Sequence, residues 1–107
     1  MQDTGLPTIE VAALEAALRG GAQLVDVREP AEYVAGHVPG ARLVPMGQLP
    51  ARLGELDRGR PVHLVCASGN RSGAMARVVA AAGFEAVNVE GGTQAWISSG
   101  RAVERGL

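Results

Sequence analysis

The sequence VHLVCASGNRS, residues 62–72, contains the strongest structural signal of the chain. Residues 62–66 form a mostly apolar run that ends in Cys66, and this pattern predicts a buried strand. Small and polar residues follow, and residues 72–82 then place apolar side chains at helical spacing. The stretch therefore predicts a strand, a tight loop and a helix, with the one cysteine of the chain where the strand ends.

The rest of the chain alternates between helical and strand patterns. Further strands are predicted over residues 23–27, 41–44 and 86–89, and further helices over residues 11–19, 29–35, 47–56 and 93–99. Several strands are apolar without a period of two, which is typical of a mostly parallel sheet covered by helices on both faces. Residues 1–7 are polar and contain Gly and Pro, so they are expected to form a flexible lead-in.

Composition excludes several classes of function. The 107 residues suffice for one domain, and a formal charge of −1 offers no electrostatic basis for binding nucleic acid or an anionic membrane. A single cysteine excludes an internal disulfide or CxxC pair. No apolar run approaches the length of a membrane span, and no export signal is visible, so a cytoplasmic location is expected. All ten basic residues are arginine, which indicates a bacterial source rich in GC codons.

The predicted topology brings chemically useful residues together. Ligands of open parallel sheets bind beyond the carboxyl ends of the strands. Cys66 ends one predicted strand, and Asp26 and Arg28 lie at the end of another. We therefore expect the thiol, the acid and the guanidinium along one edge of the sheet.

The residues after Cys66 favour its thiolate form. Gly69 permits a positive φ, so the loop can curl and direct successive backbone N–H groups inward. The N-terminus of the following helix and the guanidinium of Arg71 add positive charge. A lowered pKa of Cys66 and a role as nucleophile follow from this interpretation. The alternative is a small buried hydrophobe, as most free cysteines are.

At this point the sequence resembles a known family, the rhodanese-like sulfurtransferases. Four stretches carry the resemblance in the right order, over roughly residues 8–105: the loop 66–72, the stretch YVAGHVPGA at 33–41, the stretch DVRE at 26–29, and Gly91-Gly92 with Trp96. The main departure is Glu10, where a serine cap of the first helix is expected. The resemblance implies a single rhodanese-like domain with a five-stranded, mostly parallel sheet flanked by helices.

The resemblance also implies a two-step sulfur transfer. The Cys66 thiolate attacks a sulfane sulfur donor such as thiosulfate, and the resulting persulfide passes its outer sulfur to cyanide or a thiol. No cofactor is implied, and a protein could serve as donor or acceptor. The implied site consists of Cys66 as nucleophile, of Ala67, Ser68, Gly69, Asn70, Arg71 and Ser72 around the substrate, and of Asp26 and Arg28 in support.

Other functions remain open at this stage. Tyrosine phosphatases and arsenate reductases place five residues between the cysteine and the arginine, whereas four separate Cys66 from Arg71. The shorter loop predicts a cradle for one sulfur atom rather than for a tetrahedral phosphate. A non-catalytic interaction module is expected to lack the nucleophile or the loop pattern. A sulfur carrier between protein partners retains the same chemistry.

The remaining polar residues are expected to be structural. His37, within the GHVPG stretch, is predicted to be a hydrogen-bonded structural histidine, because attack by a thiolate needs no base. Trp96 is predicted to anchor the last helix in the core. One cysteine and two separated histidines give no metal-ligand spacing, so no metal is expected. Arg28 is expected either to help bind an anionic donor or to form a surface ion pair.

Overall fold

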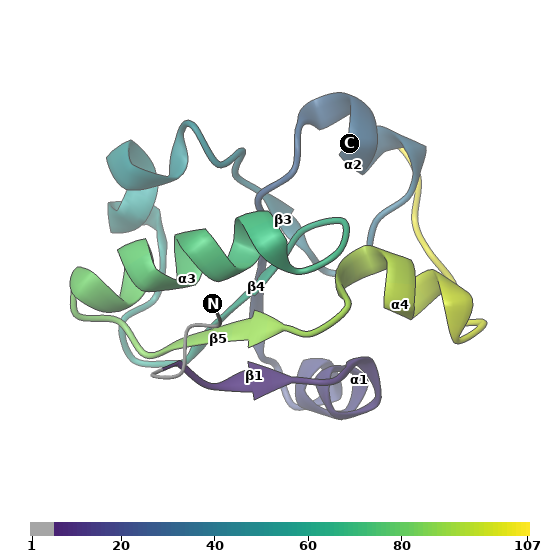
Figure 1. Ribbon diagram of the computed structural model, residues 1–107, viewed down its shortest axis with the longest axis horizontal. Helices are drawn as coiled ribbons and strands as arrows, with labels where there is room; N and C mark the ends of the chain where they lie inside the picture. The colour runs from purple at the N-terminus through teal and green to yellow at the C-terminus, as the bar shows by residue number, and fades with distance from the viewer. Residues whose placement is uncertain (1–5) are drawn as a thin grey trace.

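The computed structural model describes residues 6–107 and contains a five-stranded sheet in the order β1-β5-β4-β2-β3 (Figure 1). Every strand pairing is parallel. Neighbouring strands therefore end at the same edge of the sheet. The strands are β1 (Thr8–Ile9), β2 (Gln23–Asp26), β3 (Arg42–Leu43), β4 (Val62–Val65) and β5 (Ala86–Val89).

The edge strand β1 is the element that the sequence pattern does not predict. It has two residues, and Thr8 pairs with Asn88 while Ile9 pairs with Val89. A strand of this length carries no periodicity, so only its pairing with β5 defines it. The four other strands match the predicted ones within a residue at either end.

Within residues 6–107, four helical segments connect the strands, and a fifth, α4, follows the last strand. The predicted helix over residues 47–56 is a 3₁₀ helix, η1, and Pro50 near its start supplies no backbone N–H for an α-helical ladder. The helix after Cys66 begins at Asn70, two residues earlier than predicted, because Gly69 acts as its N-cap. The segments are α1 (Val11–Arg19), α2 (Pro30–Ala35), η1 (Leu49–Glu55), α3 (Asn70–Ala81) and α4 (Gly92–Ser98).

The sheet separates two hydrophobic cores, as expected for a sheet covered on both faces. One core packs β2 and β4 against α3 and η1, and Val25, Leu64 and Cys66 belong to it. The other packs the opposite sheet face against α1, α2 and α4, and Val65 and Trp96 belong to it. Adjacent residues of β4 thus point into different cores, which accounts for a continuous apolar strand.

The lead-in predicted over residues 1–7 is only partly covered by the structure. Residues 1–5 lie outside the described part of the chain. Leu6 packs against the core of α3 and η1, and the carbonyl of Pro7 accepts a hydrogen bond from the N–H of Asn88 at 3.0 Å. Leu6 and Pro7 therefore belong to the packed domain. Within residues 6–107, no helix is long and apolar enough to cross a membrane.

Candidate active site

Cys66 lies directly after β4, at the carboxyl edge of the sheet, with its sulfur enclosed by its own loop. The residue is 1% exposed. The backbone N–H of Gly69 donates to Sγ at 3.1 Å, and the hydroxyl of Ser72 lies 3.3 Å from Sγ. Cys66 is therefore buried, as expected of a small hydrophobe, but its sulfur also faces hydrogen-bond donors.

The donors outweigh burial in their effect on the pKa of Cys66. Burial raises this pKa because it disfavours the charged thiolate. Hydrogen bonds from the Ser72 hydroxyl and from the backbone N–H groups of Ser72, Gly69 and Ser68 lower it, and the net result is a lowered pKa. The loop can thus stabilise a sulfur anion, the reactive form of a cysteine.

Two glycines shape the loop. Gly69 has a φ of 109°, which turns its N–H toward the sulfur. Gly92, at the start of α4, has a φ of 62°, and a Cβ there would lie 2.6 Å from the carbonyl oxygens of Cys66 and Ala67. This close approach lets the N–H groups of Thr93 and Gln94 donate to the same two carbonyls, at 2.8 and 3.0 Å. Helix α4 therefore holds the first half of the loop.

Asn88 of β5 supports the second half of the loop, a role that no sequence pattern indicates. Its Nδ2 donates to the carbonyl of Gly69 at 3.1 Å, and its Oδ1 lies 2.6 Å from the Ser72 hydroxyl. The Ser72 hydroxyl has one proton but two acceptors, Asn88 Oδ1 and Cys66 Sγ. Asn88 thus orients the group that lowers the pKa of Cys66.

Arg71 makes an ion pair that the sequence pattern does not predict. Its Nη1 and Nη2 each donate to one carboxylate oxygen of Glu32 at 2.8 Å. Glu32 lies in α2, 39 residues away in sequence. The guanidinium group of Arg71 is expected from the sequence to face a sulfur anion, but both of its terminal nitrogens donate to the Glu32 carboxylate. Predicting this pair would have required a sequence pattern that links the stretch DVREPAE, residues 26–32, to the cysteine loop.

Asp26 and Arg28 lie at the same edge of the sheet, as expected, and they form an ion pair with each other. Arg28 Nε and Nη2 donate to the Asp26 carboxylate at 2.8–3.1 Å, and Nη2 also donates to the carbonyl of Gly36 at 2.9 Å. Asp26 is 0% and Arg28 6% exposed. The pair is thus buried, so the surface ion pair expected as one alternative for Arg28 is wrong, and the binding of an anionic donor by Arg28 stays a prediction. This pair ties the end of β2 to the end of α2.

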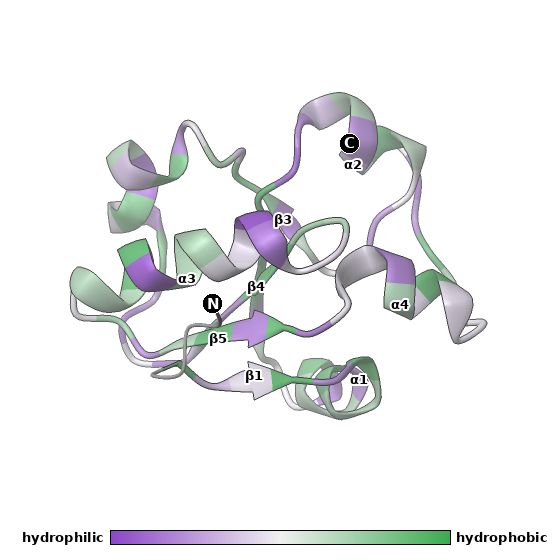
Figure 2. Cartoon of the chain, in the orientation of Figure 1, coloured by the Kyte–Doolittle hydropathy of each residue, from purple (hydrophilic) through white to green (hydrophobic). Residues whose placement is uncertain are grey.

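The other predicted loop residues have less specific positions. The carbonyl of Ala67 accepts the N–H of Gln94. Ser68 and Asn70 are exposed, and Asn70 is the first residue of α3. Figure 2 shows that this start of α3 is hydrophilic, in contrast to the hydrophobic strand β4 behind it. The exposed residues leave the rim of the loop polar.

His37 and Trp96 have the structural roles predicted for them. The His37 ring stacks on Tyr33 with 3.6 Å between ring centroids, and its Nδ1 lies 2.8 Å from the Tyr33 carbonyl. Trp96 is buried, and its indole N–H donates to the carbonyl of Ala102 at 2.8 Å. Both contacts serve packing rather than the sulfur chemistry.

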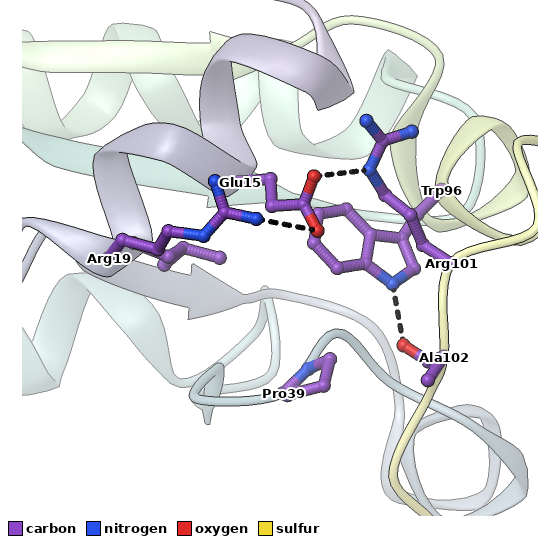
Figure 3. Close-up of a pocket in the computed structure, with 7 residues that line it drawn as sticks. Glu15, Arg19, Pro39, Trp96, Arg101 and Ala102 are labelled. Carbon is purple, nitrogen blue, oxygen red and sulfur yellow. Dashed lines mark hydrogen bonds and ion pairs between the residues drawn. The ribbon is translucent and has the colours of Figure 1, made fainter.

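A second pocket lies away from the cysteine loop, between α1, α4 and the segments around Pro39 and Ala102. Its volume is about 350 Å³. Figure 3 shows Glu15 between two arginines, Arg19 and Arg101, with the indole of Trp96 behind them. Glu15 contacts the guanidinium groups of both Arg19 and Arg101, so the charged side chains that line this pocket are paired with one another.

Comparison with known proteins agrees with the fold. The family model described as "Rhodanese-like domain" matches residues 10–99. The "Putative sulfurtransferase YtwF" of Bacillus subtilis is 37% identical over 90 residues, 82% of this chain and 87% of that protein. The "Putative sulfur carrier protein YrkF" of the same organism is 38% identical over 68% of this chain but only 40% of that protein. The "Uncharacterized protein YqhL" is 43% identical over 70% of this chain and 60% of that protein.

Solved structures give the same result. A rhodanese-like domain protein from Staphylococcus aureus superposes with a TM-score of 0.85 at 34% identity, covering 95% of this chain and 100% of that one. A thiosulfate sulfurtransferase from Pseudomonas aeruginosa superposes with a TM-score of 0.83 at 28% identity, covering 95% of this chain and 21% of that one. The chain belongs to the rhodanese-like domain family. Its one cysteine in this loop fits sulfur transfer in general.

Proposed function

We propose that this protein is a sulfurtransferase in which Cys66 carries the sulfur as a persulfide. The observation that carries the proposal is the pair of donors, the Gly69 N–H and the Ser72 hydroxyl, that contact Sγ at 3.1 and 3.3 Å. Donors fixed in place around a sulfur stabilise the anion before and after it receives a second sulfur. A covalent intermediate divides the transfer into two easier steps.

The first step forms one sulfur–sulfur bond and breaks another. With thiosulfate as donor, the Cys66 thiolate attacks the outer sulfur, and sulfite departs with the electron pair of the broken bond. The persulfide anion that results carries the single negative charge of the former thiolate. No cofactor takes part, because the cysteine sulfur itself holds the transferred atom.

The second step regenerates the thiolate. A nucleophile such as cyanide attacks the outer sulfur of the persulfide and leaves as thiocyanate, or a thiol accepts the sulfur as its own persulfide. With one cysteine in the chain, the acceptor must be a different molecule. A protein thiol in the cytoplasm is one such acceptor, and the likeness to a protein named as a sulfur carrier supports a protein partner.

Two alternatives have less support. A phosphatase needs its loop arginine for the phosphate oxygens, but both terminal nitrogens of Arg71 donate to Glu32. A purely structural module has no need of donors around Sγ. The four-residue spacing between Cys66 and Arg71 also gives a cradle smaller than a tetrahedral oxyanion requires.

The test is the intact mass of the protein after incubation with thiosulfate or, separately, with a small organic persulfide. Gain of one sulfur atom is expected, with its loss on addition of cyanide and its absence in Cys66→Ala. Ser98→Ala is the matched control, because Ser98 is exposed at the end of α4 and lies outside the cysteine loop, and it should gain sulfur like the wild type. If neither donor adds sulfur to the wild type, the proposed function is wrong.

A further inference from the structure

Two arginines at the carboxyl edge of the sheet, Arg71 and Arg28, are paired with carboxylates. The Glu32–Arg71 pair has two parallel hydrogen bonds of 2.8 Å, and both side chains are about one-third exposed. Arg28 is paired with Asp26 in the same two-pronged manner and is almost fully buried. A bidentate arginine–carboxylate pair is held by both geometry and charge. Neither arginine therefore offers a free fork to an anion that approaches Cys66.

Glu32 is also fixed from its own side. Its Oε1 accepts the backbone N–H of Glu29 at 2.9 Å at the start of α2. Chiefly the hydrogen bond from Arg71, together with this backbone contact, lowers the pKa of Glu32 to about 2. The carboxylate is thus ionised at any pH at which the Cys66 thiolate forms. The Glu32–Arg71 pair has no net charge there.

We propose that Glu32 determines donor specificity: by neutralising Arg71 it disfavours dianionic donors such as thiosulfate and leaves the site suited to uncharged organic persulfides. This inference rests on the proposed function and concerns the charge of the donor. A thiolate and a dianion repel each other, and a free arginine beside them would offset that repulsion. An uncharged persulfide, R–S–SH, meets no such barrier.

The favoured step is balanced without a further reactant. The Cys66 thiolate attacks the outer sulfur of R–S–SH, a new sulfur–sulfur bond forms, and the old one breaks. The organic thiolate RS⁻ leaves with the electron pair, and Cys66 is left as a protonated persulfide, which can then ionise beside the Gly69 N–H and the Ser72 hydroxyl. The leaving group carries one negative charge, whereas sulfite carries two.

The experiment measures second-order rates of Cys66 persulfide formation with thiosulfate and with the persulfide of 2-mercaptoethanol, which reacts through its uncharged R–S–SH form. Both rates are measured at one fixed pH, so that the protonated fraction of this donor is the same for every variant. Glu32→Gln should raise the thiosulfate rate at least about fivefold and change the uncharged-donor rate less than about twofold. Glu10→Gln is the control: it removes the same charge from the start of α1, where Glu10 makes no capping hydrogen bond with its side chain, so neither rate should change more than about twofold. Equal changes for both donors in Glu32→Gln would overturn the inference, because Glu32 would then act only on loop structure.

A second measurement needs no variant. Added salt screens charges, so repulsion between the wild-type site and thiosulfate should weaken as ionic strength rises. The wild-type thiosulfate rate should therefore increase with salt, and the uncharged-donor rate should stay constant. A thiosulfate rate that falls with salt would show an unpaired cation at the site and overturn the inference, although the protein would still be a sulfurtransferase. Failure of both donors to add sulfur would instead refute the proposed function.

Discussion

At the scale of single residues, the decisive group around Cys66 is the hydroxyl of Ser72. It is the one side-chain donor among the groups that lower the pKa of Cys66, the others being backbone N–H groups. Its single proton can bond either Sγ or Asn88 Oδ1. The hydroxyl can therefore change its acceptor with the charge of the sulfur: it can donate to Sγ when the thiolate or persulfide anion is present, and to Asn88 Oδ1 otherwise.

Ser72→Ala should raise the pKa of Cys66, because burial then opposes the thiolate with one donor fewer. The Cys66 thiolate of the folded protein should therefore form at a lower pH in the wild type than in Ser72→Ala. Ultraviolet titration of the thiolate, with Cys66→Ala as the blank, measures both values without requiring access to the buried sulfur. At a pH near the wild-type midpoint, the thiolate fraction should therefore be smaller in Ser72→Ala than in the wild type.

Ser68→Ala is the control for this titration, because Ser68 acts on the sulfur through its backbone N–H, which alanine retains. Its titration curve should overlay that of the wild type. A curve for Ser72→Ala that also overlays the wild type would show that the hydroxyl donates to Asn88 alone.

At the scale of elements, the loop depends on the contact between β4 and the start of α4. Gly92 allows this contact, since the carbonyl oxygens of Cys66 and Ala67 lie where its Cβ would be. Hydrogen bonds from Thr93 and Gln94 then fix both carbonyls. The shape of the loop thus comes from a helix that begins about 25 residues later in the chain.

Gly92→Ala should lower the free energy of unfolding by about 3 kcal/mol or more, because its Cβ meets backbone oxygens in addition to the strain of a positive φ. Gly100→Ala separates these two effects. Gly100 has a φ of 83°, but a Cβ added there would meet nothing within 4 Å, so its cost should be only about 1 kcal/mol. Chemical denaturation measures both values, and equal losses would contradict the role of the contact.

At the scale of the whole molecule, the Glu32–Arg71 pair joins two segments on either side of the reactive loop. Glu32 belongs to α2, and Arg71 lies in the first turn of α3. The C-terminal residues also reach α2, where the N–H of Gly106 donates to the carbonyl of Val34 at 2.9 Å (Figure 1). The position of α2 therefore depends on contacts from two distant parts of the chain.

The pair should make stability depend on pH in the acid range. The pKa of Glu32 is lowered from 4.5 to about 2, so its stabilising contribution is complete above pH 4.5 and disappears as the pH falls toward 2. Because the pair is partly exposed, that contribution should be about 1 kcal/mol. The free energies of unfolding of wild type and Glu32→Gln should differ by this amount at pH 6 and converge near pH 2. A difference that does not vary with pH would contradict the prediction.

How well the sequence predicts a feature of the structure depends on how far apart in the chain the interacting residues lie. The strands β2, β4 and β5, the helix α3 and the placement of Cys66 with Asp26 and Arg28 follow from local apolar patterns and from the rule that parallel strands end together. The strand β1 does not follow from local patterns, because it is defined by pairing with β5, about 80 residues away. The support of the loop by Asn88 does not follow from them either, because Asn88 and Ser72 are 16 residues apart.

The amino-acid sequence by itself determines a parallel α/β domain, the family, and a single cysteine on a short loop before a helix, because these features are encoded in neighbouring residues. Only the tertiary structure decides which charges of that loop are neutralised by other side chains. Arg71, predicted from its spacing to face an anion, instead pairs with Glu32, because folding brings α2 beside α3 and a carboxylate competes for the guanidinium. The local pattern specifies which charges are present, and the packing of distant elements specifies which of them are neutralised.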